Sequence, residues 1–325
     1  MSVVEVMTKP KVLVTSCETP KTGIDLLKVT CDVTILPYVE PTIEQVYAAL
    51  PGHDAVFLSG HVTVNSKFLD IAGPNLKVVS TMSAGYDHLD VPEIKRRGIK
   101  VGHTPQVLSA AVAEIAVMLM LNAARRAHEG RTLLEEGKME RGPQWLLGHD
   151  LRGSTVGIVG LGGIGQEVVK RLIGFSVRKF LYTGHNRKKA GDELGAEFVS
   201  LDDILELSDF IVLAVPLTLE TRALFNDAVF NKMKKTAVLV NVGRGAVVQT
   251  SSLLKALKEK KIFAAGVDVI DPEPLPSDHE LLKLPNFEIV PHLGSATIKT
   301  RNEMSAVAAQ NILDALENQP LAYPL

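Results

Sequence analysis

The stretch that most constrains the fold is "GLGGIG", Gly160 to Gly165, which follows the apolar run "TVGIV" and precedes the helical pattern "QEVVKRLIGF". Gly160, Gly162 and Gly165 have the G-x-G-x-x-G spacing that permits a tight turn and a close approach of backbone N–H groups to a pyrophosphate. The following helix would also place the positive end of its dipole toward that anion. We therefore predict a dinucleotide-binding loop (the glycine loop), which includes Gly163 and Ile164, rather than a structural glycine-rich turn.

Elsewhere the chain alternates short apolar runs with helical patterns, for example those that begin at Ile43, Gln166 and Ser252. The apolar runs do not alternate with polar residues, so we predict that each is a strand covered on both faces. They are "KVLVT" from Lys11, "AVFLS" from Ala55, "KVVST" from Lys77, "TVGIVG" from Thr155, "FIVLAV" from Phe210, "TAVLVNV" from Thr236 and "FAAGVDV" from Phe263. This alternation predicts an α/β fold with doubly wound parallel sheets.

Two domains are expected, because 325 residues exceed what a single hydrophobic core usually organises. About half of the chain precedes the glycine loop and has its own strand-helix alternation. The apolar stretch 107–124 is long enough to suggest a membrane span, but it contains Glu114 and Asn122 and continues into Arg125 and Arg126. We interpret it as a buried helix that joins the domains, with Ser109 as its candidate N-cap.

The composition excludes several classes of function. The chain has 35 basic and 37 acidic residues and no basic block, so a nucleic-acid partner is not expected. Cys17 and Cys31 are too few for a disulfide framework or a thiolate metal site, and no metal is predicted. The first residues lack the pattern of a secretion signal. We therefore expect a soluble protein of the reducing cytoplasm.

The stretch "LYTGHNRKK" bears on which dinucleotide is bound. About twenty residues after a glycine loop, an Asp or Glu usually binds the adenosine ribose of NAD. Here the corresponding residues are Thr183, Gly184, His185, Asn186 and Arg187, none of them acidic. A carboxylate would repel a 2′-phosphate, whereas Arg187 and the small Thr183-Gly184 turn would accept one. This predicts a preference for NADP(H) over NAD(H); the alternative is an ordinary solvated basic loop.

Three later strand ends each supply a polar side chain. "VLVNVGRG" ends with Arg244, "AAGVDVIDPEPLP" contains Asp268 and then Glu273 between two prolines, and "IVPHLGSAT" contains His292. A lone histidine is more often a surface residue than a catalyst, and a surface ion pair is the simpler explanation for Arg244 or Glu273 alone. Ligands of open α/β sheets bind beyond the carboxyl ends of the strands, so we expect these side chains to converge there.

The ordered motifs "GLGGIG", "VPLTLET", "NVGRGAVV", "GVDVIDPEPLP" and "PHLGSAT" resemble the D-isomer-specific 2-hydroxyacid dehydrogenases over nearly the whole chain. The stretches "STMSAGYDHLD", "RGIKVGHTPQVLSAAVAE", "FLYTGHNR" and "RNEMS" are most similar to the glyoxylate/hydroxypyruvate reductases of that family. The resemblance implies a Rossmann cofactor domain, residues 106–294, inserted in a flavodoxin-like substrate domain formed by residues 1–105 and 295–325.

The same resemblance implies roles for individual residues. His292 is similar to the proton donor of the family, Glu273 to its carboxylate partner and Arg244 to the group that binds the substrate carboxylate and carbonyl. The loop Ser83-Ala84-Gly85 looks like the one whose backbone N–H groups hold the carboxylate. The positions that would line the nicotinamide end of the site are Val215, Pro216, Val242, Asp268, Gly294 and Ser295.

Three residues depart from the pattern of the family. Gly163 stands where the family very often has Arg, so one pyrophosphate contact is expected to be missing. His185 stands where NADP-preferring reductases usually have Arg, which leaves 2′-phosphate recognition to Arg187 and Asn186. Gly243 replaces the usual Ser or Ala before the catalytic Arg, and little effect is expected from it.

The function implied is the NADPH-dependent reduction of glyoxylate or hydroxypyruvate, a small 2-oxo acid, to glycolate or D-glycerate. The alternatives are a phosphoglycerate or D-lactate type dehydrogenase of the same family, and a non-catalytic dinucleotide sensor similar to the co-repressors of this fold. The resemblance also implies a homodimer in which the segment around Trp145 lies near the substrate site of the partner. Pocket volume is expected to depend on residues 58–61, and with it the choice of oxo acid.

Overall fold

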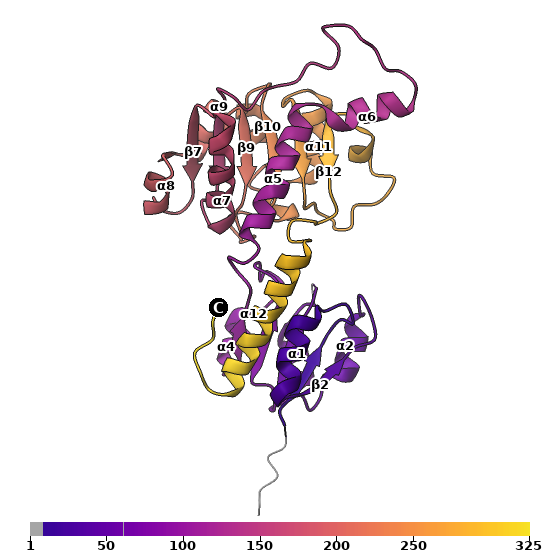
Figure 1. The fold of residues 1–325 in the computed structure, drawn as a ribbon, viewed down its shortest axis with the longest axis vertical. Helices are drawn as coiled ribbons and strands as arrows, with labels where there is room; N and C mark the ends of the chain where they lie inside the picture. The colour runs from indigo at the N-terminus through magenta and orange to yellow at the C-terminus, as the bar shows by residue number, and fades with distance from the viewer. Residues whose placement is uncertain (1–8, 61) are drawn as a thin grey trace, which may run out of the picture. The chain divides into compact units, whose positions relative to one another are not determined.

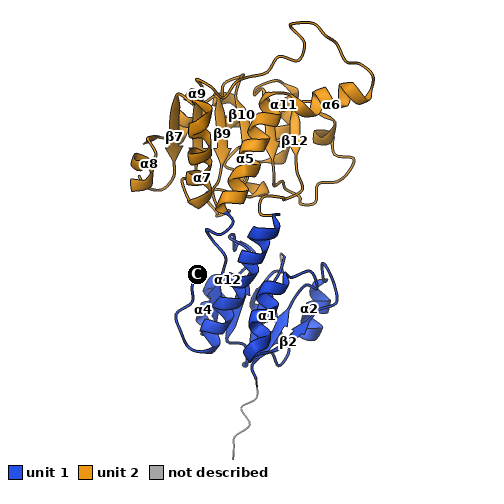
Figure 2. Cartoon of the chain, viewed as in Figure 1, with its two compact units in different colours: residues 1–108, 296–325 blue, residues 109–295 orange. Residues whose placement is uncertain are grey.

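The computed structural model describes residues 9–60 and 62–325, so His61 of the expected pocket loop lies outside the described residues. The chain has two compact units (Figure 2). Unit 1 contains the chain up to Leu108 and again from Ala296 onward, and unit 2 is the continuous segment Ser109–Ser295. Each unit is built on its own parallel sheet, which confirms the predicted α/β fold class.

The sheet of unit 1 has five parallel strands in the order β2-β1-β3-β4-β5, which is the flavodoxin-like order. Strands β3 and β4 are buried along their whole length, which accounts for the absence of polar alternation in their sequences. The elements are β1 (Lys11–Val14), α1 (Lys21–Thr30), β2 (Asp32–Ile35), α2 (Ile43–Ala49), β3 (Ala55–Leu58), α3 (Ser66–Ala72), β4 (Val78–Thr81), α4 (Val91–Arg96), β5 (Lys100–Gly102) and α12 (Ile298–Leu316).

Helix α12 returns the chain to unit 1 and packs beside α1 (Figure 1). It also packs against β4. A Cβ atom on Gly23 of α1 would lie only 2.4 Å from the Ser305 hydroxyl, so the two helices approach closely at this glycine. The Ser305 hydroxyl accepts a hydrogen bond from the Gly23 N–H at 3.2 Å and donates one to the Pro20 carbonyl at 2.9 Å. With Ile312 fully buried, α12 is an integral part of the core of unit 1.

The sheet of unit 2 has seven parallel strands in the order β12-β11-β10-β9-β6-β7-β8. Read from β8, this is the usual Rossmann strand order 3-2-1-4-5-6 with β12 added at the far edge. The elements are α5 (Ser109–Ala124), α6 (Ala127–Glu135), β6 (Thr155–Val159), α7 (Gly163–Leu172), η1 (Ile173–Phe175), β7 (Lys179–Thr183), α8 (Lys189–Glu193), β8 (Ala196–Phe198), α9 (Leu201–Leu207), β9 (Phe210–Leu213), α10 (Asp227–Lys232), β10 (Val238–Asn241), η2 (Gly245–Val247), α11 (Thr250–Lys258), β11 (Ala264–Val267), η3 (Glu280–Lys283) and β12 (Phe287–Ile289).

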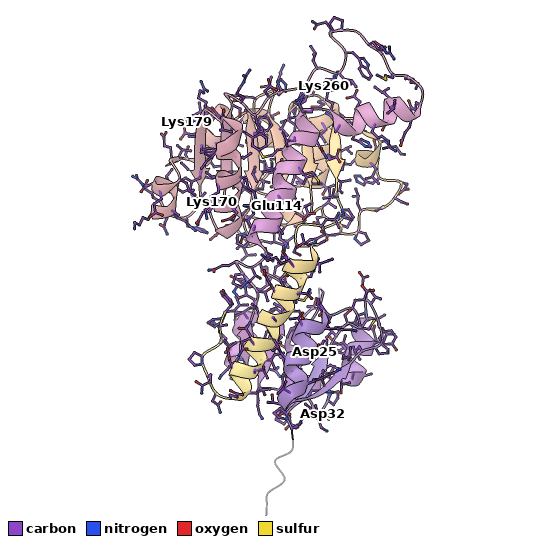
Figure 3. All side chains as sticks on the ribbon, viewed as in Figure 1. Asp25, Asp32, Glu114, Lys170, Lys179 and Lys260 are labelled. Carbon is purple, nitrogen blue, oxygen red and sulfur yellow. The ribbon has the colours of Figure 1, made fainter. Side chains whose placement is uncertain are left out.

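Helices cover both faces of this sheet. Side chains of α9, α10 and α11, such as Leu205, Phe230 and Leu253, share one apolar cluster with Leu239 of β10. Helix α5 packs on β10 and β11 beside α7, and Figure 3 labels Glu114 and Lys170 on these two neighbouring helices. Figure 3 also labels Lys179, the first residue of β7, and Lys260, which precedes β11, so both mark the amino-end edge. The carboxyl ends of all seven strands therefore share the opposite edge.

All seven predicted strands are present, as β1, β3, β4, β6, β9, β10 and β11. The predicted helix over residues 107–124 is α5, but its first residue is Ser109, so the prediction of Ser109 as the N-cap is wrong by one position. In the described part of the chain no helix combines the length and the hydrophobicity that crossing a membrane requires. Nine residues of α5 are buried within the protein instead.

Candidate active site

The glycine loop connects β6 to α7 at the point where the strand order of unit 2 reverses, between β6 and β9. Gly160 has φ +96°, and a Cβ atom on it would lie 2.7 Å from the Ala214 carbonyl oxygen. A Cβ atom on Gly165 would lie 2.3 Å from the Gly160 carbonyl oxygen, whereas one on Gly162 would meet no atom within 4 Å. Gly160 and Gly165 therefore serve the tight turn, and Gly162 leaves the backbone open to a ligand.

Gly163, the first residue of α7, lies against the start of α5. A Cβ atom there would be 2.6 Å from the Ser109 hydroxyl oxygen. A side chain at this position would therefore require the Ser109 hydroxyl to rotate away. Since the backbone of Ile164 and Gly165 continues into α7, the N-terminus of a ten-residue helix opens directly from the loop.

The loop after β7 is closed by a buried tyrosine. The Tyr182 hydroxyl accepts a hydrogen bond from the Lys188 N–H at 2.7 Å and donates one to the Lys188 carbonyl at 3.3 Å. The Gly160 N–H donates to the Thr183 carbonyl at 3.0 Å, which ties the start of this loop to the glycine loop. Gly184 has open space around its Cβ position. The two loops are thus connected, and both contain a glycine, Gly162 or Gly184, with no atom within 4 Å of its Cβ position.

Two carboxylates that the sequence analysis did not foresee lie near this loop. Arg187 donates to Asp192 at 2.7 Å, and the Asp192 hydrogen bond and charge raise the pKa of the guanidinium. His185 Nε2 lies 3.8 Å from a carboxylate oxygen of Glu220, and both side chains are largely exposed. The stretch Thr183–Arg187 itself contains no acid, but acids from α8 and from the segment after β9 face its basic residues.

Arg244 lies in a turn that the Asn241 side chain stabilises through hydrogen bonds to the backbone. The Asn241 side chain is 1% exposed; its amide donates to the Arg244 carbonyl at 3.0 Å and its oxygen accepts the Gly243 N–H at 3.1 Å. A Cβ atom on Gly243 would lie 2.6 Å from the Val215 carbonyl oxygen. The Arg244 guanidinium donates from Nη1 to the Gly243 carbonyl at 3.0 Å. Asn241 is a site residue that the sequence analysis missed, although its place at the end of an apolar run was a usable signal.

Asp268 holds the turn that carries His292. Its buried carboxylate accepts the N–H groups of Leu293 at 2.6 Å and Gly294 at 2.9 Å, and its carbonyl accepts the His292 N–H at 2.9 Å. Burial raises the pKa of Asp268, while the hydrogen bond from Leu293 opposes that rise. With His292 in the left-handed region at φ +54°, these contacts fix a backbone conformation that few non-glycine residues adopt.

His292 and Glu273 form a short hydrogen bond, 2.6 Å between His292 Nδ1 and a Glu273 carboxylate oxygen. They come from the segments that follow β12 and β11, which are adjacent strands. Both side chains stay partly accessible, at 33% and 40% exposure, so the pair is open to a ligand. When Nδ1 is the donor, a proton exchanged with a substrate would pass through the other ring nitrogen, Nε2.

The remaining predicted site residues occupy the following places. Val215 and Pro216 follow β9, and Val242, which is 5% exposed, follows β10. Ser295 is the last residue of unit 2, directly after Gly294. Ser83, Ala84 and Gly85 follow β4 in unit 1. Trp145 is half-buried and lines a cavity of about 400 Å³ with Arg126 and Glu129. Within residues 9–60 and 62–325 no group of three or more His, Cys, Asp or Glu could hold a metal ion.

The chain is similar to several known proteins. Residues 117–294 match the D-isomer specific 2-hydroxyacid dehydrogenase, NAD binding domain family. The chain is 51% identical over 270 residues to the glyoxylate reductase/hydroxypyruvate reductase of Homo sapiens, covering 82% of each chain. It is 42% identical over 318 residues to the glyoxylate reductase of Thermofilum pendens, covering 96% of this chain and 93% of that one.

Solved structures of similar proteins share the whole fold. A protein from Thermus thermophilus has a TM-score of 0.88 and 37% identity, with 97% of this chain and 99% of that chain covered. The NADPH-dependent glyoxylate/hydroxypyruvate reductase of Sinorhizobium meliloti, in complex with NADP and malonate, has a TM-score of 0.85 and 30% identity. There the coverage is 98% of this chain and 97% of that chain.

Proposed function

We propose that the chain, which belongs to the D-isomer specific 2-hydroxyacid dehydrogenase family, reduces glyoxylate or hydroxypyruvate to glycolate or D-glycerate with NADPH. The protein is an NAD(P)-dependent oxidoreductase. The main support for this reaction is the His292–Glu273 pair, in which His292 Nδ1 lies 2.6 Å from a Glu273 carboxylate oxygen. The pair lies at the carboxyl-end edge of the sheet, where the glycine loop also lies. The names of the relatives support the two substrates.

In the proposed reaction His292 acts as the proton donor. A nicotinamide cofactor held by the glycine loop would supply the hydride that the carbonyl carbon of the substrate accepts. His292 delivers a proton from its ring to the carbonyl oxygen, and the Glu273 carboxylate stabilises the positive charge that the ring carries beforehand. Arg244 binds the carboxylate and polarises the carbonyl with its guanidinium. The backbone N–H groups of Ser83, Ala84 and Gly85 are also proposed to bind the carboxylate.

The test is to measure turnover of a panel of 2-oxo acids with each cofactor. Turnover is monitored as the loss of NADPH or NADH absorbance. We expect glyoxylate and hydroxypyruvate to give the highest kcat/KM. Faster turnover of pyruvate or of a phosphorylated hydroxypyruvate would instead assign the chain to the lactate or phosphoglycerate type. Tight dinucleotide binding without turnover of any oxo acid would support a non-catalytic sensor.

The proposed cofactor domain is residues 106–294. The proposed substrate domain is formed by the remaining segments, residues 1–105 and 295–325. The cofactor would lie against the glycine loop, including Gly162, and against Thr183 to Arg187. Its nicotinamide end would lie near Val215, Pro216, Val242, Gly294 and Ser295. A cytoplasmic location remains a prediction from composition.

Preference for NADPH over NADH is proposed to depend on Arg187. Arg187 and Asp192 are 70% and 51% exposed, and exposed ion pairs are weak, so a dianionic phosphate can displace Asp192 from the guanidinium. A charge-assisted contact of this kind corresponds to a preference on the order of ten- to a hundredfold. Arg187→Ala is therefore expected to raise KM for NADPH by roughly that factor and to leave KM for NADH almost unchanged. Gly184→Asp is expected to reverse the preference.

The matched control is Lys189→Ala, which removes a positive charge that is 91% exposed and paired with Glu193. It is expected to change neither Michaelis constant. Equal kcat/KM with both cofactors in the unmodified enzyme would contradict the role of Arg187 while leaving the proposed reaction intact.

A homodimer is proposed from the family resemblance, with the half-buried Trp145 at the interface. Tryptophan is enriched in interfaces, and here it lines a cavity beside the Arg126–Glu129 ion pair. Sedimentation velocity at micromolar concentration is expected to give a dimer of the 35.1 kDa chain, and Trp145→Ala is expected to shift it toward monomer. A monomer at that concentration would contradict this proposal.

A further inference from the structure

Two successive carbonyl groups after β4 are held by the residues that follow β5. The Ser83 carbonyl accepts the Thr104 N–H at 2.9 Å, and the Ala84 carbonyl lies 3.1 Å from Nδ1 of the His103 ring. A carbonyl oxygen cannot donate a hydrogen bond, so the His103 Nδ1 must carry the proton. Both peptide groups are thereby oriented from the same side.

The opposite side of these peptide groups presents two N–H donors. In a planar trans peptide the N–H points away from the preceding carbonyl, so the N–H groups of Ala84 and Gly85 point away from residues 103 and 104. Neither has a hydrogen-bond acceptor among residues 9–60 and 62–325. Two adjacent N–H donors at the carboxyl end of a parallel strand suit a carboxylate, which accepts one hydrogen bond on each oxygen.

His103 is itself held in place by contacts within unit 1. Its N–H donates to the Tyr323 carbonyl at 3.2 Å, and its carbonyl accepts the Asn311 side-chain amide at 3.0 Å. The imidazole stacks edge-on with Tyr86, with the ring centroids 5.7 Å apart. Burial lowers the pKa of His103, so the ring is neutral near pH 7 with its proton on Nδ1. The backbone of residue 103 is thus fixed independently of its side chain.

We propose that His103 is a positioning residue for the substrate carboxylate, because its ring fixes the peptide plane that aims the Gly85 N–H at that carboxylate. The inference rests on the proposed function, in which the Ser83-Ala84-Gly85 loop binds the carboxylate of a 2-oxo acid. Only the Ala84 carbonyl depends on a side chain, since the backbone of Thr104 holds that of Ser83. Loss of the ring therefore releases one of the two N–H donors.

The variant His103→Leu tests this role, because it keeps an apolar side chain of useful size and removes the donor. It is expected to raise KM for glyoxylate on the order of tenfold, with the Kd of oxalate for the NADPH complex rising by a similar factor. The Kd of NADPH should stay within about twofold, since none of the residues proposed to hold the cofactor lies in this loop. His103→Asn retains a side-chain N–H donor and should recover most of the oxalate affinity.

His53→Leu is the matched control. His53 is also buried in unit 1, with Nδ1 lying 3.4 Å from the Leu50 carbonyl, but it precedes β3 at the amino-end edge of the sheet. It should leave both oxalate and NADPH affinity unchanged. A His103→Leu variant with unchanged oxalate affinity, or a His103→Asn variant as weak as His103→Leu, would overturn the proposal.

Two further measurements keep the outcomes distinct. In ¹⁵N-histidine-labelled wild type, NMR should show His103 as the Nδ1-protonated tautomer, a result that needs no variant; the Nε2-protonated tautomer would overturn the inference. Wild type that binds oxalate but turns over no oxo acid would refute the proposed function and leave the inference on His103 standing. Wild type that does not bind oxalate would refute the inference itself.

Discussion

Replacing His292 with alanine is expected to lower kcat for reduction by roughly 10²- to 10⁴-fold, the usual contribution of a positioned general acid. The imidazole is the proton donor in the proposed reaction, and its Nδ1 lies 2.6 Å from a carboxylate oxygen of Glu273. Alanine has no group that can replace it. The Kd of NADPH, measured by fluorescence titration, should change little because the glycine loop is untouched.

Two comparisons isolate the role of the ring. Glu273→Gln keeps a hydrogen-bonding side chain but removes the negative charge, so its kcat should fall by less than that of His292→Ala. His279→Ala removes a histidine in the connection between β11 and β12 whose ring accepts the Leu281 N–H. This variant should keep near-normal turnover. Near-normal turnover by His292→Ala itself would refute the assignment of the proton donor.

Replacing glycines of the glycine loop is expected to separate ligand binding from folding. Gly162→Ala adds a Cβ atom where no protein atom lies within 4 Å, so the free energy of unfolding should fall by no more than about 1 kcal/mol, the cost of a weaker N-cap. The added methyl group blocks the approach of a pyrophosphate to the backbone. The Kd for NADPH should rise at least on the order of tenfold, by loss of a charge-assisted contact.

Gly165→Ala should damage the fold as well. Its Cβ atom would lie 2.3 Å from the Gly160 carbonyl oxygen, a backbone atom that cannot rotate away. Overpacking of this kind costs about 1–3 kcal/mol, so Tm should drop together with NADPH affinity. Gly174→Ala, which also meets no atom within 4 Å, is the control and should affect neither quantity. Unchanged NADPH affinity in Gly162→Ala would mean that the loop is only a structural turn.

The fold was largely predictable because its strands are buried on both faces and their apolar runs are continuous. Among the described residues, most strands that the apolar runs did not include are short or exposed; β7, which has five residues of which three are buried, is the exception. β2 is an edge strand with three of its four residues exposed, while β5 and β8 have only three residues each. Such strands form because they pair with a neighbouring strand, and not because they contain a long apolar run. Pairing between strands cannot be seen in a single sequence.

The site residues that follow a strand end, such as Arg244, Glu273 and His292, could be identified from the sequence. The site was not predictable where a residue acts through a partner far along the chain. Asp268 accepts N–H groups that follow it by 25 and 26 residues, and Glu220 lies near His185 across the sheet edge. Distances of this kind depend on strand order, which local patterns do not specify.

The division of unit 1 between the two ends of the chain has a consequence for biosynthesis. Unit 2 is one continuous segment, so it can fold as soon as it leaves the ribosome. Unit 1 cannot, because α12 supplies Ala308, Ala309 and Ile312 to its core and is translated after the whole of unit 2. At about 5–20 residues per second, the nascent first segment waits many seconds for α12 with part of its apolar surface uncovered. A pause in translation before Ile298 would prolong that exposure and favour aggregation of unit 1 over that of unit 2.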